Sequence, residues 1–130
     1  MIDHLSTYAT DYLATKRFYE AALAPLSARF QIEMTSTWDP DFPTGRFCAF
    51  GPERPVFWVI EVRRPATPRH IAFSASTRAR VDAFYRAALG AGGRDNGAPG
   101  VRAIYHANYY GAFALDPDGN NVEAVCHAPE

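Results

Sequence analysis

The sequence has no apolar run near the roughly 18 residues that a membrane-spanning helix needs, so no membrane span is expected. It also lacks an excess of charge, because 13 Lys and Arg against 14 Asp and Glu leave a formal net charge of −1. Surfaces that bind nucleic acid or anionic membranes carry a strong positive bias, so neither partner is expected. The first residues lack the basic and apolar segments of a signal peptide.

Cysteine is scarce as well. The chain has two cysteines, Cys48 and Cys126, each within an apolar, strand-like segment. Buried free thiols in a cytoplasmic protein are favoured here over a disulfide. The 130 residues, 48% of them hydrophobic and 14% aromatic, are enough for one globular domain with a core of its own.

The chain resembles itself at a shift of 66 residues. This shift gives eleven identities over 64 aligned pairs, where ordinary residue frequencies would give about four. The strongest block aligns "KRFYEAALAP" (16–25) with "DAFYRAALGA" (82–91). We therefore predict a single domain built from two repeats, 1–64 and 67–130, with the proline-containing segment 63–69 between them.

Each repeat has the same predicted order of elements. Segments 2–9 and 70–76 alternate with period two, which is typical of a half-buried strand. A helix with an apolar stripe follows in each repeat, and strand-and-turn segments come after it, with a further strand expected at 29–37 and at 101–106. Four aromatic residues at helical spacing are expected in the core: Phe18, Tyr19, Phe84 and Tyr85. The predicted fold class is α+β, with two tandem βαβββ modules.

The segment "NNVEAV" (120–125) places an acidic residue in an otherwise apolar strand. A lone carboxylate removed from water costs several kcal/mol unless it has a positive or hydrogen-bonding partner. No lysine or arginine lies near Glu123 in the sequence, so its partner must come from elsewhere in the fold. His4 and His70 are equivalent under the repeat, and each shares its strand face with small or polar residues. A cavity in which Glu123 bonds to both imidazoles without a metal is the simpler alternative.

Together, the tandem modules, the histidine on the first strand of each, and "DPDGNNVE" (116–123) resemble the vicinal oxygen chelate superfamily. That superfamily includes glyoxalase I, fosfomycin and bleomycin resistance proteins, and extradiol dioxygenases. The resemblance spans essentially the whole chain and implies an open, curled barrel whose inner wall holds a divalent metal. By position it implies the ligands His4, His70 and Glu123, with Glu123 or a metal-bound hydroxide as the base. Zn, Mn, Ni and Fe(II) all fit this ligand set.

The repeat alignment also shows a departure from glyoxalase I. Glu123 aligns with Phe57, where glyoxalase I enzymes have a fourth ligand, so ordinary glyoxalase I activity is not expected. Two neutral imidazoles and one carboxylate leave coordination positions open, which is the arrangement of a catalytic metal. Its substrate would be a small molecule that presents two adjacent oxygens.

The segment 97–113 is rich in glycine and aromatic residues, and in the resemblance it lines or covers the cavity. The predicted substrate contacts are Tyr8, Phe57, Tyr109 and Tyr110. Arg102 is a weaker candidate for binding an anionic substrate. His106 and His127 fall outside the pattern and are expected in a loop and at a strand end on the surface.

The leading hypothesis is a cytoplasmic, metal-dependent enzyme of the vicinal oxygen chelate type. Isomerisation, lyase chemistry, thiol addition and oxygen insertion are all compatible with it. The alternative is a metal-free protein that sequesters a small molecule, as bleomycin resistance proteins do. A third reading is a non-catalytic structural dimer with a filled cavity. Module exchange between chains is common in the resemblance, so a homodimer is expected.

Overall fold

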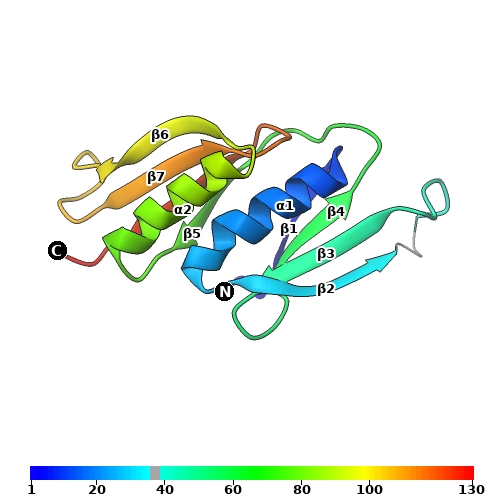
Figure 1. The fold of residues 1–130 in the computed structure, drawn as a ribbon, viewed down its shortest axis with the longest axis horizontal. Coiled ribbons are helices and arrows are strands. Elements are labelled where there is room, and N and C mark those ends of the chain that lie inside the picture. The colour runs from blue at the N-terminus through cyan, green and yellow to red at the C-terminus, as the bar shows by residue number, and fades with distance from the viewer. Residues whose placement is uncertain (36–38) are drawn as a thin grey trace.

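The computed structural model describes residues 1–35 and 39–130, in which two α-helices and one short 3-10 helix accompany eight strands (Figure 1). The first half contains β1 (Leu5–Ala9), α1 (Tyr12–Leu23), η1 (Ala24–Leu26), β2 (Arg29–Thr35), β3 (Arg46–Gly51) and β4 (Phe57–Glu61). The second half contains β5 (His70–Ser74), α2 (Arg78–Gly90), β6 (Arg94–Val101), β7 (Tyr110–Leu115) and β8 (Asn121–Cys126).

The strands form two four-stranded mixed sheets with the same topology. Their orders are β1-β4-β3-β2 and β5-β8-β7-β6, and in each sheet the first pair is parallel and the others are antiparallel. Neither sheet closes into a barrel. The predicted α+β class with two βαβββ units is confirmed.

Both helices lie side by side on one face of the paired sheets (Figure 1). Phe18, Tyr19 and Phe84 are fully buried between helices and sheets, as their helical spacing predicts. Each such ring contributes roughly 1.5–3 kcal/mol of hydrophobic free energy. Tyr85 is only half-buried, and its hydroxyl donates to Asp95 at 2.9 Å. The opposite face of each sheet, turned away from the helices, is called its open face below.

The DPDGN turn connects the two modules through a buried polar cluster. The carboxylate of Asp116, 1% exposed, accepts hydrogen bonds from the Tyr19 hydroxyl at 2.6 Å and from the Asn120 side-chain nitrogen at 2.8 Å. The backbone N–H groups of Asp118 and Asn120 also donate to it. Asn120 in turn donates to the Thr7 hydroxyl on β1, at 3.3 Å. The DPDGN segment, on which the resemblance depends most, therefore has a structural role, since its donors replace the water that a buried carboxylate loses.

The expectation of a strand at 101–106 is wrong, because the strand at this place, β6, ends at Val101. Segment 102–109 is a loop closed by the Arg102 N–H donating to the Tyr109 carbonyl at 2.7 Å. β6 contains glycine and proline, so its sequence lacks the pattern of a strand and did not predict one. These residues are tolerated because β6 is an edge strand with two register shifts. Residues 36 and 37 of the strand predicted at 29–37 lie outside the described residues.

No helix among the described residues is long and apolar enough to cross a membrane.

Candidate functional site

The open face of the second sheet carries one continuous row of side-chain positions across its four strands. Ala72 on β5 pairs with Glu123 on β8, which pairs with Phe113 on β7, which pairs with Gly97 on β6. Residues paired across neighbouring strands project on the same face of a sheet. Glu123 therefore stands on the side opposite the helices, away from the main core.

Glu123 is 1% exposed although it lies on the open face. The Tyr109 hydroxyl donates a hydrogen bond to its Oε1, and its Oε2 lies 3.1 Å from Nε2 of His70. A Cβ atom added to Gly111 would lie 3.0 Å from Oε1, so glycine at this position leaves room for the carboxylate. The buried acid thus has two named partners, both supplied by distant parts of the chain.

The backbone fixes the protonation pattern of His70. Its Nδ1 lies 3.1 Å from the carbonyl oxygen of Asn121, and because a carbonyl only accepts, Nδ1 carries the hydrogen. In a neutral ring Nε2 then presents a lone pair to the carboxylate oxygen of Glu123, which also only accepts. Two acceptors at 3.1 Å need a proton or a metal cation between them. This pair is the chemical centre of the site.

Tyr109 covers the carboxylate from the β6–β7 loop. Burial, together with the hydrogen bond to Glu123, raises the pKa of Tyr109 to about 12, while the positive charge of Arg102 acts in the opposite direction. The phenol therefore stays protonated near neutral pH and donates to Glu123. The structure places Tyr109 against Glu123, and its contact with substrate stays a prediction.

Tyr109 is itself held by two histidines that sequence reasoning treated separately. Its ring packs edge-on against His106 and His127, with centroids 5.5 and 5.2 Å away. His106 Nε2 lies 2.8 Å from His127 Nδ1, and the Asn108 N–H donates to His106 Nδ1. Because Nδ1 of His106 accepts, its Nε2 carries the hydrogen and donates to His127. The two positions are 21 residues apart with no shared periodicity, so only the path of the loop reveals the pair.

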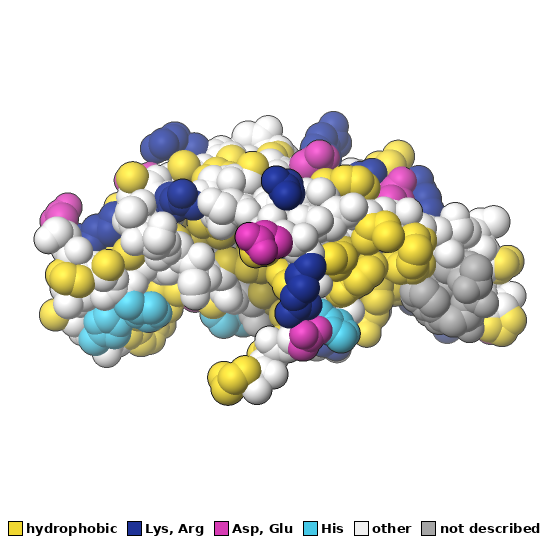
Figure 2. Space-filling model, turned by 90° about the horizontal axis from the view of Figure 1, so that it is seen from below, with side chains coloured by type: hydrophobic (Ala, Val, Ile, Leu, Met, Phe, Trp, Pro, Cys, Tyr) yellow, Lys and Arg dark blue, Asp and Glu magenta, His cyan; other side chains and the backbone are white. Residues whose placement is uncertain are grey.

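His4 lies on the open face of the first sheet. It lines a pocket of about 200 Å³ with Ser6, Phe47, Trp58 and Ile60, and its Nδ1 is 2.8 Å from Asp3 Oδ1. Within one chain, no three His, Cys, Asp or Glu side chains of the described ranges gather as a metal site would require. Figure 2 shows the histidines as separate patches along one side of the molecule. A single chain thus brings His70 and Glu123 together, without His4.

The strand pairing assigns the counterpart of Glu123 differently from the ungapped repeat. Leu5 pairs with Phe57 on β4, and the equivalent residue Ile71 pairs with Val122 on β8, so Phe57 matches Val122 and Trp58 matches Glu123. The ring of Phe57 faces the helices and contacts Tyr19 at 4.8 Å and Phe73 at 5.2 Å between centroids. The alignment of Phe57 with Glu123 is therefore corrected to Trp58, which lines the His4 pocket.

The other two predicted substrate contacts, Tyr8 and Tyr110, lie on different faces of their sheets. Tyr8 pairs with Ile60 on the open face of the first sheet, and the Arg69 guanidinium lies 5.5 Å from its ring centroid. Tyr110 points toward α2, where its hydroxyl donates to Asp82 at 2.7 Å. Tyr110 is thus on the opposite side of the sheet from Glu123.

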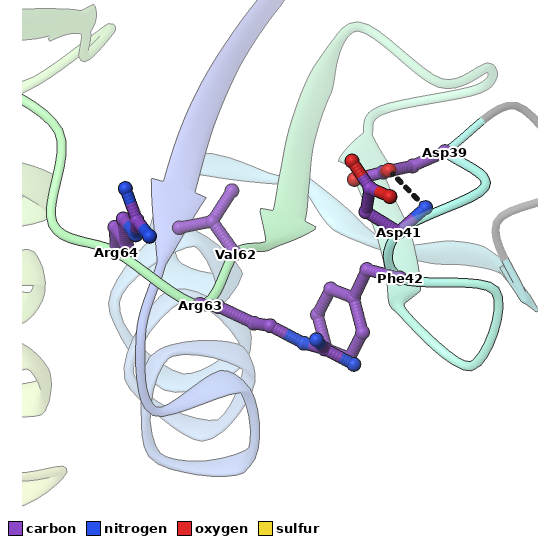
Figure 3. A pocket seen from close by; sticks show the side chains of 6 residues that line it. All are labelled: Asp39, Asp41, Phe42, Val62, Arg63 and Arg64. Carbon is purple, nitrogen blue, oxygen red and sulfur yellow. Dashed lines mark hydrogen bonds between the residues drawn. The ribbon is translucent and has the colours of Figure 1, made fainter.

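A larger pocket, of about 640 Å³, has no histidine among its lining residues (Figure 3). It is lined by Asp39, Asp41 and Phe42 on one side and by Val62, Arg63 and Arg64 on the other. The Arg63 guanidinium packs on the Phe42 ring at 4.5 Å. The size of a pocket is therefore a poor guide to the site here, because none of the predicted metal ligands lines this surface hollow.

Two tandem βαβββ units with open sheets and a His-Glu pair on one open face define the class of fold and site. A family model described as "Glyoxalase/Bleomycin resistance protein/Dioxygenase superfamily" matches residues 1–124. The chain belongs to this superfamily.

Solved structures with similar folds share little sequence with the chain. A glyoxalase/bleomycin resistance protein from Albidiferax ferrireducens is 24% identical with a TM-score of 0.75, each chain being covered to 98%. A glyoxalase/bleomycin resistance protein/dioxygenase family enzyme from Burkholderia phytofirmans is 19% identical with a TM-score of 0.67, again with 98% coverage of both. A glyoxalase I mutant from Zea mays is 21% identical with a TM-score of 0.68, and the match covers 99% of this chain and 45% of that one. No curated protein sequence matches.

Proposed function

We propose that the protein is a metal-dependent enzyme of this superfamily that acts on a small molecule with two adjacent oxygens. His70 and Glu123 of one copy and His4 of a second copy would hold the divalent metal. The observation that carries the proposal is the approach of two acceptor atoms, His70 Nε2 and Oε2 of the buried Glu123, to 3.1 Å.

The residues present fit such a metal. Imidazole nitrogen and carboxylate oxygen each bind divalent metals at about 2.0–2.2 Å, so two ligands 3.1 Å apart can share one ion. The Nδ1–H of His70 is already anchored to the Asn121 carbonyl, which orients the ring and leaves Nε2 free to coordinate. A hydroxyl donating to the second carboxylate oxygen, as Tyr109 does, orients Glu123 in the same way.

A second copy of the chain would supply what one copy lacks. The first sheet offers His4 on an apolar open face, and the second sheet offers His70 and Glu123 on its own open face. Pairing two copies about a twofold axis, with unlike open faces together, would enclose two identical cavities. This arrangement keeps the predicted homodimer and gives it a functional reason.

The metal would act as a Lewis acid on the paired substrate oxygens. Glu123 is the base in this proposal. Its Oε1 accepts from the Tyr109 hydroxyl, so Oε2, which would hold the metal, would have to leave the metal to accept a proton. Tyr109 and the His106–His127 pair exclude water from the carboxylate. The donor set serves isomerisation, lyase chemistry, thiol addition and oxygen insertion alike.

The test is metal analysis of protein purified without chelator and then titrated with Zn, Mn, Ni and Fe(II). The proposal expects about one tightly bound ion per chain, with affinity reduced at least 100-fold in His70→Ala. Arg86→Ala is the control, since it removes an exposed side chain of α2, on the helix side of the sheet, and should keep the metal. A protein that takes up no ion, or a His70→Ala variant that binds as well as the parent, contradicts the proposal.

A metal-free binding protein is the second candidate, and one observation favours it. A protonated His70 would form an ion pair with Glu123 at 3.1 Å, beside the hydrogen bond from Tyr109, with no metal present. Such a protein would bind its small molecule between the same open faces and show no metal-dependent change in affinity.

A further inference from the structure

Arg102 lies on the same open face as Glu123, one residue beyond β6. Its guanidinium carbon is 5.5 Å from the ring centroid of Phe113, the residue paired directly with Glu123. The imidazole of His70 stacks on the same ring, with centroids 6.3 Å apart and planes 29° apart. One aromatic ring therefore has the proposed metal ligand and an arginine as neighbours.

Two glycines create the place where this arginine lies. A Cβ atom on Gly100 would be 2.9 Å from one terminal nitrogen of Arg102, and a Cβ on Gly97 would be 3.4 Å from the other. The guanidinium thus rests close against the backbone of β6, where Nη2 donates to the Ala98 carbonyl at 2.6 Å. This contact and the Phe113 ring hold the half-buried side chain over the sheet.

Arg102 has no acidic partner in the described part of the chain. Other arginines do: Arg46 pairs with Glu61, Arg54 with Asp3, and Arg78 with Glu130. A partly buried guanidinium keeps its charge, and its planar fork matches the two oxygens of a carboxylate. The Arg102 side chain makes one hydrogen bond, to Ala98, so its other donors are available to a ligand.

From these contacts we infer that Arg102 is the carboxylate-binding subsite of the Glu123 cavity, and that the substrate is a flat carboxylic acid. Gly97, under the guanidinium, is two strands from Glu123, which corresponds to about 10 Å. A molecule with its carboxylate on Arg102 would pass beside the ring of Phe113 and reach His70 and Glu123 with its other end. The placement of the substrate's reacting end at His70 and Glu123 depends on the proposed function. The anion subsite depends only on Arg102 and its contacts.

Benzoate and its neutral isostere benzamide are the probes, titrated into protein kept metal-free with chelator and followed by amide chemical shifts in NMR. We expect benzoate to bind at least 10-fold more tightly than benzamide, with the largest shifts at Gly97, Gly100 and Phe113. Arg102→Met removes the charge and should abolish the preference. Arg54→Met, the control, removes an exposed arginine outside the cavity and should leave the preference intact.

Equal binding of the two probes, or a preference that survives Arg102→Met, overturns the subsite. So does a change of oligomeric state in Arg102→Met by sedimentation, because Arg102 would then be meeting an acid of a second copy. Because the titration is metal-free, its result is independent of the metal analysis. Metal uptake without a benzoate preference refutes the subsite alone, and the reverse result refutes the metal proposal alone.

Discussion

The two sheets share one topology and differ in the chemistry of their open faces. Across the first sheet the equivalent row is Ser6, Trp58, Ala49 and Ile32, and across the second it is Ala72, Glu123, Phe113 and Gly97. The first row is mostly apolar, with an indole where the second has a buried carboxylate. The repeat therefore preserves the backbone and the helix-facing core, while the open faces have diverged into an apolar wall and a wall with the acid.

The sharpest way to break this comparison is to place a carboxylate at each of two neighbouring positions on β4. Phe57→Glu would bury a charge against Tyr19 and Phe73 and should destabilise the fold by several kcal/mol. Trp58→Glu would mirror Glu123 on the open face and should fold, at a cost below about 2 kcal/mol. Urea denaturation measures both. Equal loss of stability in the two variants would contradict the strand register.

The next largest loss of stability is expected at the buried polar cluster that joins the two modules. Tyr19→Phe removes the 2.6 Å hydrogen bond to the buried carboxylate of Asp116 and should cost about 2 kcal/mol. Phe18→Leu, at the neighbouring buried position, alters packing and leaves this bond intact. Thermal and urea unfolding should show a single cooperative transition for the parent. Unchanged stability of Tyr19→Phe would show that the DPDGN cluster does not hold the modules together.

The two adjacent tyrosines test which face belongs to the site. Tyr109→Phe leaves Glu123 with one donor fewer and should cost about 1–2 kcal/mol and weaken metal binding. Tyr110→Phe removes only the bond to Asp82 on the helix side and should leave metal binding unchanged. Calorimetric titration with Zn²⁺ measures the difference. Similar metal affinities in the two variants would count against Tyr109 as an orienting group.

The raised pKa of Tyr109 predicts a change in stability at alkaline pH. Its pKa is raised from 10.0 to about 12, so its contribution to stability is complete below pH 10 and is lost as the pH rises through 12. An ultraviolet difference titration of parent against Tyr109→Phe should show one phenol with a midpoint near 12. A midpoint near 10 would mean that the hydroxyl is free in solution.

The smallest effect concerns an ion pair of the first module that the second module does not repeat. Hydrogen bonds from Arg46, at 2.8 to 3.0 Å, lower the pKa of Glu61 below its usual 4.5. A lowered pKa stabilises the fold above pH 4.5 and loses this contribution as the pH falls through the folded value. Glu61→Gln should therefore cost up to about 1 kcal/mol at pH 7 and progressively less as the pH falls through the lowered pKa of Glu61. A cost independent of pH would rule out the ion pair as its source.

Much of the fold was accessible from the sequence because its signals are local. Helical spacing identified Phe18 and Phe84, strand alternation identified β1 and β5, and the proline and glycine of the turn identified the β7–β8 connection. These patterns follow from side-chain periodicity and turn geometry alone. The same logic marked Glu123 as a buried acid in need of a partner.

The counterpart of Glu123 was misassigned for a physical reason. The first strands and the helices of the two repeats align at a shift of 66 residues. The strands β4 and β8 align at a shift of 65, because the intervening loops differ in length. Side chains alternate with period two, so an error of one residue moves a side chain to the other face of the sheet. This is why Phe57 was expected at the cavity and Trp58 was not. The contacts of His106, His127 and Arg102 depend on loop path, which periodicity does not encode.

The most direct test of the metal proposal is complementation between two variants that each lack one ligand. In the proposed dimer, a His4→Ala chain mixed with a His70→Ala chain forms a mixed dimer with one intact site, made of His70 and Glu123 from the first chain and His4 from the second. We predict that neither variant alone binds Zn²⁺ tightly, and that the mixture recovers one tightly bound ion per mixed dimer. No recovery on mixing, or full affinity in His4→Ala alone, would contradict a site shared between two copies.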